Sequence, residues 1–466
     1  MNVIIYGLDK FPNLINSLSD SLKIKTFFCE DVNKKLIDGC KNYSYNFHCT
    51  ENDKFIPNAP KNIIEELKTD QFLFFLIMNS RHSKAILRNS LFSFRSIDHD
   101  INSFYNLVDF FYHTLTQNKI ELVIFHNIPH EGGDYLLYKV AKLLNIRTII
   151  HYQSMMYNRY CILENIDDFK KNYPPQRIVN KEDNKYQKDT EKKLDHVNKL
   201  VFIEEAEKVL DKKSKIQKFN KNWLKLLLAL FSFKKQTIYK RLIRISLYLR
   251  KLREISNYIN LRNKVVSYDF DLEEKFTYFA LHVTPELSVI PLGGDVFYDQ
   301  ITALQKLSDL LPDDFYIYVK DHPFQDNIGR DSDFFVRLKK IKNLKLIPTN
   351  FSSSELVKKS QFVSTICGTV GFEAIKIGKE VLTFGFAWYS GFSGVFQYKE
   401  NFNIAELLAN NIDQDIFNKE LSDISKRLYV GIVDRDYEKK VSNDYCPEQN
   451  QKLLYSNLMS IINEKQ

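Results

Sequence analysis

A short polar loop after a strand-like apolar run offers groups that bind phosphate. The run Tyr316–Val319 is long enough for a buried strand, and Lys320, His322 and Pro323 follow it. Lysine supplies a fixed positive charge, histidine supplies a donor whose protonation can change, and proline ends the strand and fixes the shape of the loop. Because parallel sheets bind ligands at the carboxyl ends of their strands, we expect this loop to line a ligand site.

A second loop of the same kind follows the apolar run Phe362–Thr365. Residues 367–371 read Cys-Gly-Thr-Val-Gly and precede a helix-like pattern that ends at Gly378. Free N–H groups and the helix dipole at such a helix start favour a phosphate, and we expect Glu373, in the first helical turn, to reach a ribose beside it. The two loops together predict a nucleotide phosphate site. Its expected residues are Lys320, His322, Pro323, Ser364, Thr365, Gly368, Thr369 and Glu373.

Three blocks in this half of the chain resemble bacterial capsule polysaccharide biosynthesis glycosyltransferases, a family that includes the Kdo transferases of capsule and lipopolysaccharide assembly. The blocks start at Tyr278, Lys320 and Ser364, and the last two read Lys-Asp-His-Pro and Ser-Thr-Ile-Cys-Gly-Thr-Val-Gly-Phe-Glu-Ala. They occur in the order found in the family. The resemblance implies a two-domain GT-B fold and a nucleotide-sugar co-substrate, with no resident cofactor.

A third loop, in the first half of the chain, carries imidazoles and carboxylates. It follows the apolar run Leu122–Phe125 and includes His130, Glu131 and Asp134 around a Gly-Gly pair. Such groups can act as a base toward a sugar hydroxyl or as a nucleophile on an anomeric carbon, so we expect them to be catalytic. The alternative is structural, with His130 capping the next helix and the two acids stabilising its first turn. This loop again resembles the N-terminal domain of the same transferases.

Glu286 is a further candidate for the transfer chemistry. It lies after the apolar run 276–281, on the side of the sheet where ligands bind. The resembled transferases have a carboxylate near this block at the centre of sugar transfer. The block departs from the family pattern, which often carries a glutamine and an aspartate where this chain has His282 and Glu286.

Alternating strand-like and helix-like segments predict an α/β protein with two Rossmann-like domains. A chain of 466 residues is too long for one ordinary core and suits two domains. We expect an acceptor-side domain over 1–205, a basic helical insertion over 206–265, a nucleotide-sugar domain over 266–435 and a C-terminal helix over 436–466. The resemblance implies that this last helix packs back on the first domain.

Basic residues are concentrated in one segment. The chain carries a net charge of +8, whereas residues 208–264 contain seventeen Lys and Arg and two acidic residues, so the remainder is about −7. Amphipathic patches in this segment suit an anionic membrane surface, where each cation contributes on the order of 1 kcal/mol. The alternative is a solvated helical hairpin packed on the core. No nucleic-acid-binding module accompanies the charge, so we expect no nucleic-acid partner.

We expect a cytoplasmic protein in peripheral contact with the inner membrane. The first apolar run, residues 3–6, is too short for a signal peptide and reads as a strand. No segment reaches the roughly 18 consecutive apolar residues that a membrane span needs. The six cysteines contain no C-x-x-C pair, which favours neither a zinc site nor a disulfide framework.

The resemblance implies transfer of a sugar onto a growing capsule or lipopolysaccharide glycan. The first choice of donor is a CMP-activated acidic ulosonate such as Kdo, and uracil and guanine nucleotides stay open. One alternative is a teichoic-acid-like polyol-phosphate transferase that uses a CDP-polyol. The other is a non-catalytic partner in capsule assembly or export that docks through its basic helices.

No metal ion is expected in the reaction. Asp313 and Asp314 precede the strand that begins at Phe315, which is the wrong end of a strand for a ligand. We expect the leaving-group charge to be met by Lys320, His322 and helix N–H groups.

EDTA is therefore predicted to leave the rate of sugar transfer nearly unchanged, because no step depends on a divalent cation. The measurement is the initial rate before and after chelation. Full loss of activity that Mg²⁺ restores would show that the charge is met by a metal.

Overall fold

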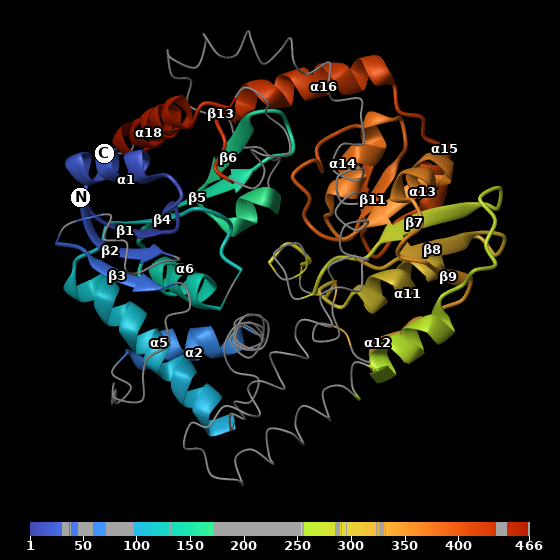
Figure 1. Cartoon of the computed structure of the whole chain (residues 1–466), viewed down its shortest axis with the longest axis horizontal. Helices are drawn as coiled ribbons and strands as arrows, with labels where there is room; N and C mark the ends of the chain where they lie inside the picture. Colours follow the sequence, from blue (N-terminus) through green and yellow to red (C-terminus); the bar gives the residue numbers. More distant parts are fainter. Residues whose placement is uncertain are drawn as a thin grey trace, which may run out of the picture.

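Two α/β bodies lie side by side in the computed structural model (Figure 1). The residues that it describes are 1–29, 37, 39–44, 59–70, 97–130, 132–170, 253, 256–284, 289, 291–294, 296–322, 325, 330, 332–434 and 445–464. Each body is built on its own sheet, so the predicted pair of Rossmann-like domains is confirmed. The predicted basic insertion lies almost wholly outside the described residues.

In the described part of the chain, the first sheet has seven strands in the order β13-β6-β5-β4-β1-β2-β3. These are β1 (Asn2–Tyr6), β2 (Lys23–Cys29), β3 (Lys41–Ser44), β4 (Leu122–Phe125), β5 (Arg147–Gln153), β6 (Arg159–Leu163) and β13 (Tyr429–Val430). Strands β1 to β5 pair in parallel, and β6 runs antiparallel between β5 and β13. The central strands are apolar and buried, as a sheet covered on both faces requires.

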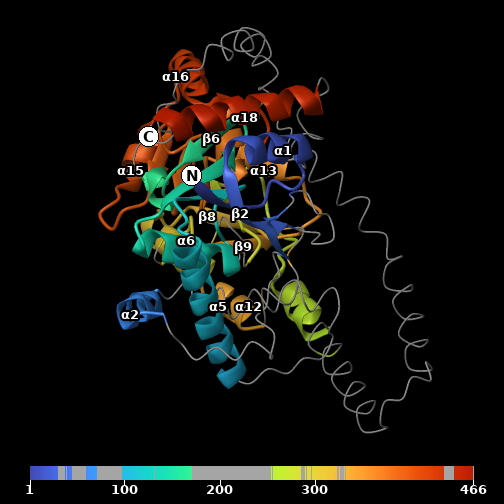
Figure 2. The ribbon, with the colours of Figure 1, turned by 90° about the vertical axis from the view of Figure 1, so that its left-hand side faces the viewer.

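Helices cover both faces of this sheet. They are α1 (Pro12–Ser21), α2 (Lys61–Thr69), α5 (Ile97–Gln117), α6 (Gly133–Leu143) and α18 (Pro447–Glu464), with a 3₁₀ turn at Ile166–Lys170. The buried side chains of α1 and α18 share one hydrophobic cluster, and those of α2, α5 and α6 share the other. Figure 2 shows α18 beside α1, so the C-terminal helix packs against the start of the chain.

The second sheet is wholly parallel in its described strands, with the order β12-β11-β10-β7-β8-β9. The strands are β7 (Phe276–Ala280), β8 (Tyr316–Lys320), β9 (Leu344–Ile347), β10 (Phe362–Thr365), β11 (Val381–Thr383) and β12 (Val395–Gln397). Counted from β7, this is the Rossmann order 3-2-1-4-5-6, which reverses direction between β7 and β10. Ligands of such sheets bind at that switch point, outside the carboxyl ends of the strands.

Helices surround the second sheet or follow it. Those with labels are α11 (Gln300–Leu310), α12 (Ser332–Leu338), α13 (Ser353–Lys359), α14 (Thr369–Lys376), α15 (Ile404–Ala409) and α16 (Gln414–Arg427). Buried residues of α11 and α12 pack on one face, and those of α13 and α14 on the other. Among the residues that the structure covers, no helix combines the length and apolarity that crossing a bilayer requires.

Two predicted apolar runs form strands with the same bounds. They are β4 and β10, and the apolar residues 344–347 likewise form β9. Asp413 caps α16, and the apolar residues after Arg427 form β13 in the first sheet. Strand β5 continues to Gln153, because β6 pairs with its last residues.

Gly7 fixes how closely β1 and β4 approach at their carboxyl ends. Its φ angle is +92°, and a Cβ atom there would lie 2.2 Å from His126 Nδ1 and 2.6 Å from His126 Cβ. The ring cannot rotate out of the way, because the clash reaches the root of the side chain. A glycine is therefore required both by the backbone conformation and by the neighbour.

Gly7→Ala is predicted to lower the free energy of unfolding by about 2–4 kcal/mol, because it adds a steric clash to an unfavourable φ angle. Gly39→Ala is the matched control: its φ is +73°, and no atom lies within 4 Å of the added Cβ. That change should cost only about 1 kcal/mol. Thermal melting of both variants tests this, and equal losses in Tm would show that the approach of His126 is unimportant.

Candidate functional site

Three loops meet at the carboxyl end of the second sheet, at its switch point. They follow β7, β8 and β10, and β7 lies between the other two strands. The register pairs Ala280 with Lys320, so His282 and His322 each lie two residues beyond paired positions on neighbouring strands. The third loop continues β10 as far as Gly368, the N-cap of α14. The two loops that the sequence predicted are therefore close in space, and the β7 loop lies between them.

A hydrogen bond joins the loops on the two sides of the switch point. His282 Nε2 lies 2.9 Å from Thr365 Oγ1, and Thr365 Oγ1 also accepts the N–H of Gly368 at 3.1 Å. A Cβ at Gly368 would lie 2.8 Å from His282 Cε1 and 2.9 Å from Thr365 Oγ1. Only glycine allows this close packing, and its amide is held at the start of α14.

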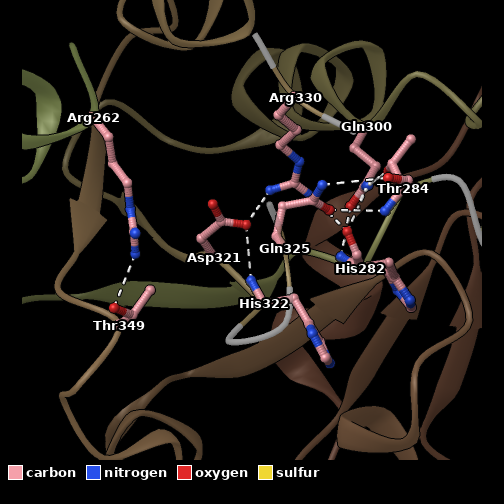
Figure 3. Close-up of polar contacts among 9 residues, drawn as sticks. All are labelled: Arg262, His282, Thr284, Gln300, Asp321, His322, Gln325, Arg330 and Thr349. Atoms are coloured by element: carbon pink, nitrogen blue, oxygen red, sulfur yellow. Dashed lines mark hydrogen bonds and ion pairs between the residues drawn. The ribbon is translucent and has the colours of Figure 1, made fainter. Parts of the chain in front are cut away.

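The backbone of His282 is fixed by two side chains from outside its loop (Figure 3). Gln300 Oε1 accepts the His282 N–H at 2.8 Å, and Gln300 Nε2 donates to the His282 carbonyl at 3.1 Å. Arg330 donates to the same carbonyl and to Asp321 Oδ1, and that oxygen also accepts the His322 N–H at 2.8 Å. In Figure 3 both imidazole rings point away from Arg330.

Both imidazoles of the site are uncharged at neutral pH. Burial, followed by the charges of His322 and Arg330, lowers the pKa of His282 to about 3. Burial, followed by the charges of Arg330 and Lys320, lowers the pKa of His322 to about 4. A neutral imidazole has one N–H donor and one acceptor nitrogen, so the two rings can bind a ligand through hydrogen bonds without adding charge.

Two predicted phosphate-binding residues have partners inside the protein. Lys320 is buried, and its Nζ donates to the Phe351 carbonyl at 2.5 Å and to Ser353 Oγ at 2.6 Å, at the start of α13. Ser364 is buried within β10, with its Oγ 3.0 Å from Thr277 Oγ1 in the sheet. The ammonium group is thus held behind the loop, and the serine lies in the sheet. A direct phosphate contact by either stays a prediction.

Glu373 lies deeper than the sequence predicted. Helix α14 begins at Thr369, immediately after its N-cap Gly368, and its first turn contains no acidic residue. The expectation that Glu373 lies in that first turn is wrong, since it is the fifth residue of the helix. Its side chain is fully buried. Burial lowers the pKa of Lys376 on the same helix, and the charge of Glu373 acts in the opposite direction. Its contact with a ribose stays a prediction.

The helix start itself is exposed and firmly placed. Thr369 is exposed, and the Tyr389 hydroxyl donates a hydrogen bond to the Gly368 carbonyl just before it. A Cβ at Gly371 would lie 2.3 Å from the Tyr389 hydroxyl oxygen, so this glycine lets the phenol reach the loop. The N–H groups at the start of α14 are therefore presented from a rigid support, as an anion site requires.

Three predicted site residues lie outside the described residues. They are Glu131, Glu286 and Pro323. Their expected roles stay predictions.

In the first domain, the structure separates the roles of His130 and Asp134. Asp134 is buried, and its carboxylate accepts the N–H groups of His130 at 3.1 Å and Tyr135 at 2.7 Å, so it shapes the start of α6. His130 Nδ1 lies 2.6 Å from the Ile128 carbonyl. Because a carbonyl only accepts, Nδ1 carries the hydrogen and Nε2 presents its lone pair. Asp134 therefore has a structural role at the start of α6, and the catalytic roles predicted for both side chains stay predictions.

Two more imidazoles lie at the carboxyl ends of β4 and β5. His126 Nδ1 lies 3.3 Å from the Tyr6 carbonyl, and His151 Nδ1 lies 2.9 Å from the Phe125 carbonyl. Burial lowers the pKa of His151 to about 4, so this ring is neutral and belongs to the sheet. Like His130, both rings bond a carbonyl through Nδ1.

The carboxyl ends of the two sheets face each other through Tyr152. This residue follows His151 in β5, packs against the hydrophobic cluster that contains Tyr389, and has its pKa raised by burial and then by Cys367. Cys367 belongs to the glycine loop of the second domain, and Tyr389 holds that loop. The side of the first domain that carries His130 is thus turned toward the glycine loop of the second.

Comparison with known proteins agrees with the sequence resemblance. Residues 271–430 match the family model described as capsule polysaccharide biosynthesis protein. No curated protein matches the chain. The solved structures that resemble it include two transferases of Thermosulfurimonas dismutans KpsC and a sugar-nucleotide epimerase of Neisseria meningitidis.

The similarities to these structures are remote. The KpsC beta Kdo 2,7 transferase is 12% identical, with 80% of this chain and 91% of that chain covered and a TM-score of 0.33. The beta Kdo 2,4 transferase is 15% identical, with 65% and 87% covered and a TM-score of 0.29. The UDP-GlcNAc 2-epimerase is 12% identical, with 99% and 100% covered and a TM-score of 0.24.

The family assignment rests on the match of residues 271–430, which contains the three loops of the switch point. These loops contain the sequence blocks that begin at Tyr278, Lys320 and Ser364. Over these residues, the second domain of this chain is similar to capsule polysaccharide biosynthesis proteins.

Proposed function

We propose that this chain is a glycosyltransferase that moves a sugar from a nucleotide donor onto a growing capsule glycan. The observation that carries the proposal is the meeting of the β7, β8 and β10 loops at the switch point, with the His282–Thr365 hydrogen bond between them. Ligands of Rossmann-like sheets bind at this place. The family match of residues 271–430 supports the same function.

The donor phosphate would be held by hydrogen bonds more than by charge. His322 would donate from a neutral ring, and the amides at Gly368 and Thr369 would donate from the start of α14. Lys320 would contribute its positive charge from behind the loop, because its hydrogen bonds already go to Phe351 and Ser353. These donors would stabilise the negative charge that develops on the leaving nucleotide.

The first choice of donor is a CMP-activated acidic ulosonate such as Kdo. The sequence blocks that begin at Lys320 and Ser364 support this choice by their resemblance to transferases of that donor class.

The acceptor would enter from the first domain. Its hydroxyl oxygen would attack the anomeric carbon as the bond from that carbon to the phosphate oxygen breaks, and the nucleotide would leave with the bonding electrons. A base would take the hydroxyl proton, and we propose His130 Nε2 for that role, which the contact of its Nδ1 with the Ile128 carbonyl supports. Glu131 and Glu286 are the other proposed catalytic groups, from the sequence.

Nucleotide binding tests the donor site. We predict that CMP raises the Tm of the wild-type protein more than UMP or GMP does, and that His322→Ala weakens CMP binding about tenfold, the value of one hydrogen bond of about 1.4 kcal/mol. His113→Ala, on α5 of the first domain, is the matched control and should bind CMP normally.

The alternatives give different results in the same experiments. No Tm shift with any nucleotide at millimolar concentration would favour a non-catalytic assembly or export partner. A product whose new linkage contains phosphorus would identify a polyol-phosphate transferase that uses a CDP-polyol. Normal CMP affinity in His322→Ala would remove this residue from the donor site.

The chain is also proposed to act at the cytoplasmic face of the inner membrane, in peripheral contact with anionic lipid. The support is the charge of residues 208–264, which hold seventeen Lys and Arg and two acidic residues. A lipid-linked acceptor would then be concentrated beside the enzyme. Each cation contributes on the order of 1 kcal/mol to membrane binding, so contact by only part of this segment is sufficient.

Vesicle flotation tests the membrane contact. Changing Lys240, Arg241 and Arg244 together to Glu is predicted to abolish binding to phosphatidylglycerol vesicles, because three charges change sign and the net charge at the contact falls by six units. The control changes Lys306, Lys339 and Lys342 to Glu, which are exposed residues of the second domain, and alters the net charge equally. Equal loss in both variants, or binding to neutral phosphatidylcholine, would contradict the prediction.

A further inference from the structure

A buried ion pair connects the loops that carry the two imidazoles of the donor site. Arg330 and Asp321 are each 2% exposed, and the guanidinium group also donates to the carbonyl of His282. Asp321 in turn accepts the N–H of His322. One ion pair therefore contacts the backbone of both histidines, which follow the neighbouring strands β7 and β8 (Figure 3).

The surroundings of Arg330 keep its guanidinium in one place. The ring of Phe334 lies under it, with 4.6 Å between Arg330 Cζ and the ring centroid. The titratable groups near it are Asp321, Tyr258 and Arg262, besides the two imidazoles. Arg262 donates to Thr349 Oγ1 at 2.9 Å, so this second cation is directed away from the pair.

Neutral side chains already join the same two loops. Thr284 donates its N–H to Gln325 Oε1 at 2.8 Å, and Gln325 Nε2 donates to the Thr284 carbonyl at 3.3 Å. Gln300 adds a bond to Thr284 Oγ1 at 2.8 Å. Neutral hydrogen bonds therefore already hold the two loops together. A buried ion pair is also weak evidence that it stabilises the fold.

We propose that the Asp321–Arg330 ion pair is a positioning device of the donor site, which sets the spacing and the charge state of His282 and His322. The proposal rests on the proposed function, since the two rings matter as donors to a nucleotide. Arg330 places a fixed positive charge behind both rings, which opposes their protonation. The rings then meet the donor phosphate as neutral groups at any pH near neutrality.

The lowered pKa values of the two rings agree with this geometry. Arg330 contributes to both shifts: its charge lowers the pKa of His282 after burial and the charge of His322, and it lowers the pKa of His322 after burial and ahead of Lys320. If burial acted alone, a bound phosphate could draw a proton onto either ring and hold the leaving nucleotide too tightly for release. A charge that opposes protonation keeps the bond to the nucleotide neutral and reversible.

The test is histidine NMR titration of the full chain, with the ring signals of His282 and His322 assigned by their loss in Gln variants. In the wild-type protein neither ring should titrate above pH 5. In Asp321→Asn/Arg330→Gln, which keeps a neutral pair of similar shape, the pKa of His322 should rise by about one unit, because the opposing charge is gone.

Two further variants separate charge from folding. Arg330→Lys keeps the positive charge and should keep the pKa of both rings low, although it loses the second hydrogen bond of the fork. Glu274→Gln/Lys345→Gln removes another ion pair of the same sheet, with a Nζ to Oε2 distance of 2.7 Å, and should change neither ring. Unchanged titrations in the Asn/Gln double variant would overturn the proposal.

CMP affinity, measured by calorimetry on the same proteins, distinguishes this inference from the proposed function. At pH 7 the Asn/Gln double variant should bind CMP at least fivefold more weakly, because the two rings lose their spacing, and its affinity should rise as the pH falls from 6 to 4 and His322 gains a proton. If the wild-type protein binds no nucleotide while the titrations behave as expected, the proposed function fails. The effect of the ion pair on the pKa of the imidazoles then still stands. If wild type and double variant bind CMP alike at every pH, the positioning role fails and the donor site stands.

Discussion

The hydrogen bond between His282 and Thr365 is the contact on which the arrangement of the second domain's loops depends. It crosses the point where the strand order reverses, so it joins the loops of the two halves of the sheet beyond the pairing of β7 with β10. The missing side chain of Gly368 lets the imidazole lie against the loop. The Thr365 hydroxyl that this ring contacts also accepts the amide N–H of Gly368. Displacing the ring would therefore disturb the group that fixes the start of α14.

Burial determines how charge is distributed around this contact. The cations nearest the loops have oxygen partners within the protein, Lys320 at the start of α13 and Arg330 on Asp321. The imidazoles are neutral because they are buried beside those cations. An anion would therefore meet hydrogen-bond donors in a weakly positive field, which favours selective and reversible binding over strong attraction.

Local pattern predicted the strands and loops of this domain well. Apolar runs bounded by polar residues gave the limits of β9 and β10, and the Ser352 cap at α13 follows from residue type alone. The glycine loop was recognisable because close backbone approach demands glycine. Strands β6 and β13 were missed, since their antiparallel pairing joins residues far apart in the sequence.

The roles of individual polar side chains were harder to predict for the same reason. His282 lay in a recognised block, but its partner Thr365 is 83 residues away, and Arg330 reaches its carbonyl from 48 residues away. Lys320 was predicted as a phosphate ligand from its place in the loop, and only the structure shows that Ser353 accepts one of its hydrogen bonds. Local sequence shows which groups are present near a loop end, whereas tertiary contacts decide which of them are used internally.

The path of the chain between the domains sets how the two halves of the candidate site can move. Helix α16 is tied to the second domain, because Glu420 accepts hydrogen bonds from Ser393. The strand after it is tied to the first, because Val433 donates to Gln153 at 2.9 Å and β13 pairs with β6. On this described connection only Leu428 separates helix from strand. We infer that any closure bringing His130 toward the nucleotide loops bends the connection there, since the elements on both sides are fixed to different bodies.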